Sequence, residues 1–81
     1  MLDRITETRT SFDNDLAKVT DLKSLEELRI KFLSRKGIVS ILFEDFKNVS
    51  REEKKNVGQV LNELKIHTQT NFDSLKEKLE S

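Results

Sequence analysis

Apolar residues recur along almost the whole chain with the 3.6-residue period of amphipathic helices. The first such stripe covers residues 2–18, and its apolar members are Leu2, Ile5, Phe12 and Leu16. One position of this stripe has no apolar residue. We expect Arg9 to fill it by laying its aliphatic stem along the apolar face. The segment therefore predicts a helix that buries one face.

A second helix is predicted from Ser24 to about Arg35, after a break in the pattern at residues 19–23. Ser24 and Glu27 have the spacing of a capping box, in which each side chain bonds a backbone amide at the other's position. The expected inward residues are Leu25, Leu28 and Phe32, with Leu33 as a further candidate. Gly37 is expected to end this segment, because glycine readily adopts the positive φ that closes helices.

The nine residues after Gly37 predict a short helix, with Phe43 off its apolar stripe. The residues on that stripe are Ile38, Ile41, Leu42 and Phe46. Ser50 and Glu53 form a second candidate capping box, which opens the longest predicted helix, Ser50 to about Leu79. Its stripe consists of Val57, Leu61, Leu64, Thr68, Phe72, Leu75 and Leu79.

The predicted fold is all-α, an antiparallel helical hairpin or coiled-coil arm with a short helix at its tip. The segment from Leu2 to Arg35 is about as long as the helix from Ser50 to Leu79, so two antiparallel arms would bury both stripes. The chain has no proline and only two glycines, too few to build a turn-rich β architecture. We expect residues 1–81 to form one domain and to be a fragment of a larger subunit, because the last predicted helix runs nearly to the final residue.

Composition excludes several classes of function. The chain has no cysteine and a single histidine, His67, so a thiolate or histidine-cluster metal site cannot be built. We expect no catalytic residues, no metal and no cofactor in this chain, since no catalytic constellation or glycine-rich phosphate loop is visible. The chain also lacks an apolar run of membrane-spanning length and a signal-peptide pattern, which favours a cytoplasmic protein without membrane contact.

The distribution of charge is the one feature with functional weight. The net charge is zero, but residues 29–55 carry eight Lys or Arg against four Asp or Glu. Arg29, Lys31, Arg35 and Lys36 precede Gly37, and Lys47, Arg51, Lys54 and Lys55 follow the short helix. In a hairpin these groups would converge on a phosphate backbone, whose neutralisation releases counterions. The alternative is that they compensate helix dipoles and solvate a small tip.

Two residues of the predicted long helix, Gly58 and Asn62, need a structural explanation. Gly58 costs about 1 kcal/mol relative to alanine inside a helix, so we expect another backbone of the fold to approach it closely, with a slot for the backbone of a ligand as the functional alternative. Asn62 lies four residues on, beside the stripe, and is expected to bond carbonyl groups of the tip.

The string LRIKFLSRKG, residues 28–37, resembles a signature in the N-terminal domain of the alpha subunit of bacterial phenylalanyl-tRNA synthetases. Leu28, Arg29, Lys31, Leu33, Lys36 and Gly37 match it as they stand, with Arg35 in place of lysine, Phe32 in place of tyrosine and Ser34 in place of glycine. A second block, residues 58–65, resembles the family's glycine-x-x-isoleucine-asparagine-x-x-lysine run. It is carried by Gly58, Leu61, Asn62 and Lys65.

The resemblance implies a helical arm that contacts the body of the phenylalanine transfer RNA. It implies a parent enzyme that ligates phenylalanine to tRNA(Phe) with ATP and magnesium, and that assembles with a beta subunit as an α2β2 heterotetramer. The residues expected to bind RNA are Arg29, Lys31, Arg35, Lys36, Arg51, Lys54 and Lys55. The rival hypothesis is a coiled-coil protein-interaction module without RNA binding, in which the apolar stripes pair with a partner helix.

Overall fold

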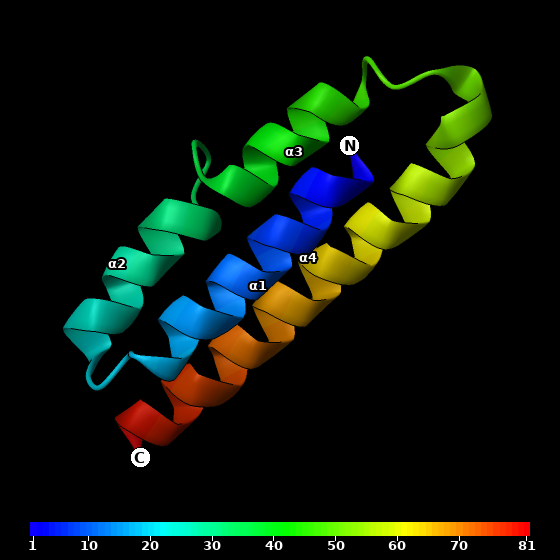
Figure 1. Cartoon of the computed structure of the whole chain (residues 1–81). Coiled ribbons are helices and arrows are strands. Elements are labelled where there is room, and N and C mark those ends of the chain that lie inside the picture. Colours follow the sequence, from blue (N-terminus) through cyan, green and yellow to red (C-terminus); the bar gives the residue numbers. More distant parts are fainter.

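The helical periods of the sequence form four helices and no strand in the computed structural model, which describes residues 1–81 (Figure 1). The helices are α1 (Leu2–Ala17), α2 (Leu22–Phe32), α3 (Ile38–Phe46) and α4 (Arg51–Glu80). The molecule measures 45 × 19 × 16 Å. At about 1.5 Å per residue, α4 alone spans the long dimension. The all-α class and the elongated helical arm are confirmed.

The first helix turns back on the arm instead of extending it. The chain reverses between Ala17 and Leu22, and α1 then contacts each of the other three helices. Figure 1 shows α2 and α3 following one another along one side, antiparallel to α4, with α1 beside them. The end-to-end placement of the segments before Gly37 was therefore wrong, and most of the arm has three helices in cross-section. A third helix lets all the apolar stripes be buried together.

Three contacts between polar side chains connect α1 to its neighbours. Arg4 lies 2.7 Å from Asp45 of α3, Asp15 lies 2.7 Å from Lys31 of α2, and Asp13 lies 2.6 Å from His67 of α4. Such exposed pairs contribute little free energy, so we assign them to register and not to stability.

The core runs along the axis of the bundle. Its buried apolar members are Ile5, Phe12, Leu25, Leu28, Phe32, Val39, Leu42, Val57, Leu61, Leu64 and Phe72. The Phe12 and Phe32 rings meet edge to face with centroids 5.4 Å apart. Thr8, and not Arg9, fills the position of the α1 stripe that has no apolar residue, because the Thr8 hydroxyl donates to the Arg4 carbonyl at 2.7 Å and is thereby satisfied when buried.

The predicted stripe of α4 is confirmed. Its first five members are buried, and the last two, Leu75 and Leu79, are half-buried. Thr68 is fully buried because its hydroxyl donates to the Leu64 carbonyl at 3.0 Å.

The starts of α2 and α4 differ from the predicted capping boxes. Asp21, and not Ser24, caps α2, since its carboxylate accepts from the Ser24 amide at 2.8 Å while the Ser24 hydroxyl accepts from the Asp21 amide. The helix consequently begins two residues earlier than predicted, at Leu22, and it ends at Phe32 instead of Arg35. Ser50 does cap α4, but its side chain makes no hydrogen bond there, so the second capping box was wrong.

The Asp21 cap predicts a specific loss of stability in acid. The hydrogen bonds from the Ser24 amide and hydroxyl lower the pKa of Asp21 below its usual value of 3.8. Because the pKa of Asp21 is lower in the folded state, its contribution to the unfolding free energy is present above the pKa of the unfolded state. This contribution is lost as the pH falls through the pKa of the folded state. We expect Asp21→Asn to flatten the acidic part of the curve of unfolding free energy against pH. An unchanged acid limb in the variant would contradict the assignment.

Gly37 is required for space and not for its φ angle. Its φ of −72° and ψ of 167° are open to any residue, and no glycine in the chain has positive φ. A Cβ placed there would lie 2.6 Å from both the carbonyl carbon and the oxygen of Phe32. The expectation of a left-handed helix stop was therefore wrong, and Gly37 instead caps the start of α3.

The inward face of α3 is rotated from the predicted one. Val39 and Leu42 are buried, Ile41 is 45% exposed, and Phe43 is half-buried. The face turns because α3 packs between two helices, α1 and α4, and not against a single arm.

Gly58 and Asn62 of α4 also differ from their predicted roles. Gly58 faces the Phe46 ring, whose Cζ would lie 3.1 Å from an added Cβ, so a side chain and not a backbone approaches it. Asn62 is exposed, and its side chain makes no hydrogen bond to the tip.

Candidate nucleic-acid interface

The junction between α2 and α3, residues 33–37, forms an elbow closed by short hydrogen bonds. The Ser34 carbonyl accepts from the Gly37 amide and from the Ser40 hydroxyl, both at 2.8 Å. The Ser34 hydroxyl in turn donates to the Ile30 carbonyl at 2.6 Å. These bonds hold the elbow backbone against the ends of both helices.

The elbow presents two unpaired cations. Arg35 and Lys36 are exposed, and neither takes part in any of the five ion pairs of the chain. Their charges are therefore available to an external anion without the loss of an internal partner.

Arg29 and Lys31, one turn before the elbow, are already engaged. The Arg29 guanidinium donates to the Glu26 carboxylate through Nε at 2.9 Å and Nη2 at 2.6 Å, which raises the pKa of Arg29 and lowers that of Glu26. Lys31 Nζ lies 2.7 Å from Asp15 and 5.2 Å from the centre of the Phe32 ring. A phosphate would have to compete with these partners.

The second basic group lies at the tip, residues 47–55, where the chain passes from α3 into α4. Arg51, Lys54 and Lys55 are exposed and free of ion pairs. Lys54 Nζ stands 5.8 Å from the centre of the Phe46 ring, and Lys47 pairs with Glu44 at 3.1 Å.

The elbow and the tip do not converge as the hairpin predicted. The nine residues of α3 lie between them, which at about 1.5 Å per residue separates the two groups by about 13 Å. The arm therefore carries two basic positions, one at each end of α3 (Figure 1).

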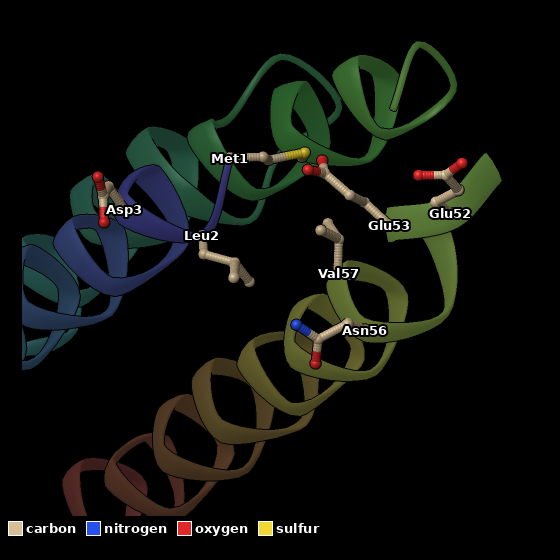
Figure 2. A pocket seen from close by; sticks show the side chains of 7 residues that line it. All are labelled: Met1, Leu2, Asp3, Glu52, Glu53, Asn56 and Val57. Atoms are coloured by element: carbon tan, nitrogen blue, oxygen red, sulfur yellow. The ribbon is translucent and has the colours of Figure 1, made fainter. Parts of the chain in front are cut away.

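A hollow at the start of α1 is lined in part by acidic residues, Asp3, Glu52 and Glu53. Figure 2 shows Glu53 near Met1, whereas Asp3 lies on the other side of Met1 and Leu2 in this view. Glu52 and Glu53 occupy the first turn of α4, where carboxylates are stabilised by the helix dipole. Across the chain, no group of three or more candidate ligands lies together, so these residues do not fit a magnesium site. None of the helices is both long and apolar enough to span a membrane.

Sequence reasoning missed a groove between α3 and α4, next to the elbow. It is lined by Leu33, Val39, Ser40, Phe43, Lys65 and Gln69. The only signal in the sequence was Phe43, an aromatic residue outside the predicted stripe of its helix.

Comparison with known proteins decides the family. The model of the family described as aminoacyl tRNA synthetase class II, N-terminal domain, matches residues 20–81. The chain belongs to this family. The match begins just before α2, so it includes the elbow and the tip of this synthetase N-terminal domain.

Two of three similar relatives match this synthetase domain over its full length, and the third matches about three quarters of it. The phenylalanine–tRNA ligase alpha subunits of Parabacteroides distasonis and Christiangramia forsetii are 44% and 43% identical over all 81 residues, which cover 23% of each relative. That of Bacteroides thetaiotaomicron is 50% identical over 62 residues, 76% of the chain and 18% of the relative. The chain thus spans less than a quarter of these relatives. No solved structure matches it. The resemblance to the N-terminal domain of these alpha subunits is confirmed.

Proposed function

We propose that this domain is the RNA-binding arm of a phenylalanine–tRNA ligase alpha subunit, which holds tRNA(Phe) by its phosphate backbone. The proposal is carried by the elbow, where Arg35 and Lys36 are exposed and have no internal partner. Arg51, Lys54 and Lys55 add a second contact at the tip. Folded RNA is recognised mostly by shape and by backbone contacts, which suits two basic positions on a packed helical bundle.

The paired cations have a smaller part in this proposal. Arg29 and Lys31 can reach a phosphate only by giving up Glu26 and Asp15, so the exchange of one anion for another returns little free energy. We therefore place the main contacts at Arg35, Lys36, Arg51, Lys54 and Lys55.

The rest of the activity belongs to the remainder of the proposed parent subunit, of which residues 1–81 form one domain. ATP-dependent aminoacylation with magnesium, the beta subunit of an α2β2 heterotetramer and a cytoplasmic location are part of the proposal. We assign the positioning of tRNA(Phe) to the arm, on the strength of the exposed cations at its elbow and tip.

The coiled-coil alternative has lost its main support. It required the apolar stripes to be free for a partner helix, but these stripes pack against each other within one chain. Five large apolar residues are exposed, and they come from all four helices. No two of them belong to the same apolar stripe. They are Leu2, Leu22, Ile30, Ile41 and Ile66.

Titration of tRNA(Phe) with the chain at low salt tests the proposed function. We expect Arg35→Gln/Lys36→Gln to weaken binding by about tenfold, because two phosphate contacts are lost. The matched control, Lys76→Gln/Lys78→Gln, removes the same charge at the C-terminal end of α4, away from the elbow, and should bind nearly as the wild type does. Equal losses in both variants would show that only net charge matters, and absence of binding would refute the function.

A further inference from the structure

We propose that the groove between α3 and α4 is a binding site for one unpaired nucleobase of the RNA, which stacks on the ring of Phe43. The inference rests on the proposed function, since the elbow cations would bring the RNA to this place. It adds a contact that reads a base, whereas the cations contact only phosphates.

The floor of the groove is apolar and aromatic. Val39 is 5% exposed, and Leu33 and Phe43 are half-buried, so a flat ring could enter without displacing the core. The groove has a volume of about 280 Å³. This lies just below the range of about 300–1,000 Å³ typical of ligand pockets, a size suited to a single ring system.

The rim supplies groups for the edge of a base and for its phosphate. Lys65 Nζ stands 5.9 Å from the centre of the Phe43 ring and forms no ion pair. Gln69 donates its amide nitrogen to Asp73 at 2.9 Å, and that bond leaves its carbonyl oxygen as an acceptor. Ser40 donates its hydroxyl to Ser34 at 2.8 Å and keeps its lone pairs. The lining contains one cation and no acid, which favours an anionic ligand such as RNA over a neutral or cationic one.

Phe46 offers an internal comparison on the same helix. It is also half-buried and also lies under a lysine, with Lys54 Nζ 5.8 Å from its ring. Its ring packs against Gly58 and lines no groove. A lysine of α4 over a phenylalanine of α3 therefore does not by itself make a binding site. Phe43 differs from Phe46 because it lines an open groove.

The test compares two ligands of equal charge. The chain is titrated with an oligouridylate of about eight nucleotides and with an abasic ribose-phosphate oligomer of the same length, in one buffer. We expect the wild type to prefer the uridylate by about five- to twentyfold, since stacking of one base on an aromatic side chain strengthens binding by about fivefold or more. Phe43→Leu should remove the preference while leaving the affinity for the abasic oligomer unchanged, and Phe46→Leu should retain it.

An upfield NMR shift of the Phe43 ring protons, produced by the uridylate and not by the abasic oligomer, is expected in the wild type and needs no variant. The site is refuted if the wild type binds both oligomers equally, if Phe43→Leu keeps the preference, or if both leucine variants lose it alike. Salt-sensitive tRNA binding without any base preference would leave the arm function standing and overturn only the base site. Loss of all RNA binding would overturn both.

Discussion

Phe12→Ala is expected to cost about 3–5 kcal/mol of unfolding free energy, the range for deleting a buried aromatic side chain. Phe12 is fully buried and meets Phe32 edge to face, so its removal leaves a cavity between α1 and α2. Typical values of about 0.05–0.15 kcal/mol per residue give a chain of this length about 4–12 kcal/mol in total. The variant should therefore unfold at a much lower urea concentration than the wild type in titrations followed by circular dichroism, and at the lower end of this range it would be largely unfolded without urea.

The control for this substitution is Ile66→Ala. Ile66 is 57% exposed on α4, and its truncation should change the unfolding free energy by no more than about 0.5 kcal/mol. A small effect of Phe12→Ala would mean that α1 does not pack as the third helix.

Gly37→Ala is the second substitution with a large expected effect. The new Cβ would lie 2.6 Å from two backbone atoms of Phe32, which cannot move aside as the end of a side chain can. Overpacking of this kind costs about 1–3 kcal/mol or more, so we expect at least this loss of unfolding free energy in urea. The elbow would also open, because the Gly37 amide bonds the Ser34 carbonyl.

Two further substitutions separate lack of space from a need for positive φ. Gly37→Asn should destabilise at least as much as alanine, whereas a left-handed position would tolerate asparagine. Gly58→Ala meets only the edge of the Phe46 ring at 3.1 Å and improves helix propensity by about 1 kcal/mol, so it should be close to neutral. A neutral Gly37→Asn would contradict the steric explanation.

The elements of this fold could be read from the sequence because each is a local pattern. The stripe of α4 repeats from Val57 to Leu79, and its inward face is the predicted one. The position of α1 could not be read in the same way, because an amphipathic stripe shows that a face is buried but not which helix covers it. The short α3 shows the same limit, since contact with α1 as well as α4 exposes Ile41 and buries Val39.

The candidate site was predicted only as a set of charges. Sequence spacing identified Arg35 and Lys36, and the structure leaves both exposed. The engagement of Arg29 by Glu26 follows an i, i+3 spacing and was open to prediction, whereas the contact of Lys31 with Asp15 depends on the reversal of α1. The groove at Phe43 depends on how α3 is rotated against α4, which no local pattern encodes.

The salt dependence of tRNA(Phe) binding tests the central claim most directly, namely that the unpaired elbow cations contact phosphates. The logarithm of the association constant is measured against the logarithm of salt concentration for the wild type and for Arg35→Gln/Lys36→Gln. We expect the slope of the variant to be shallower by about 1.4–1.8, from about 0.7–0.9 for each lost phosphate contact. Parallel lines for the two proteins would contradict the claim, because the elbow cations would then release no counterions from the RNA.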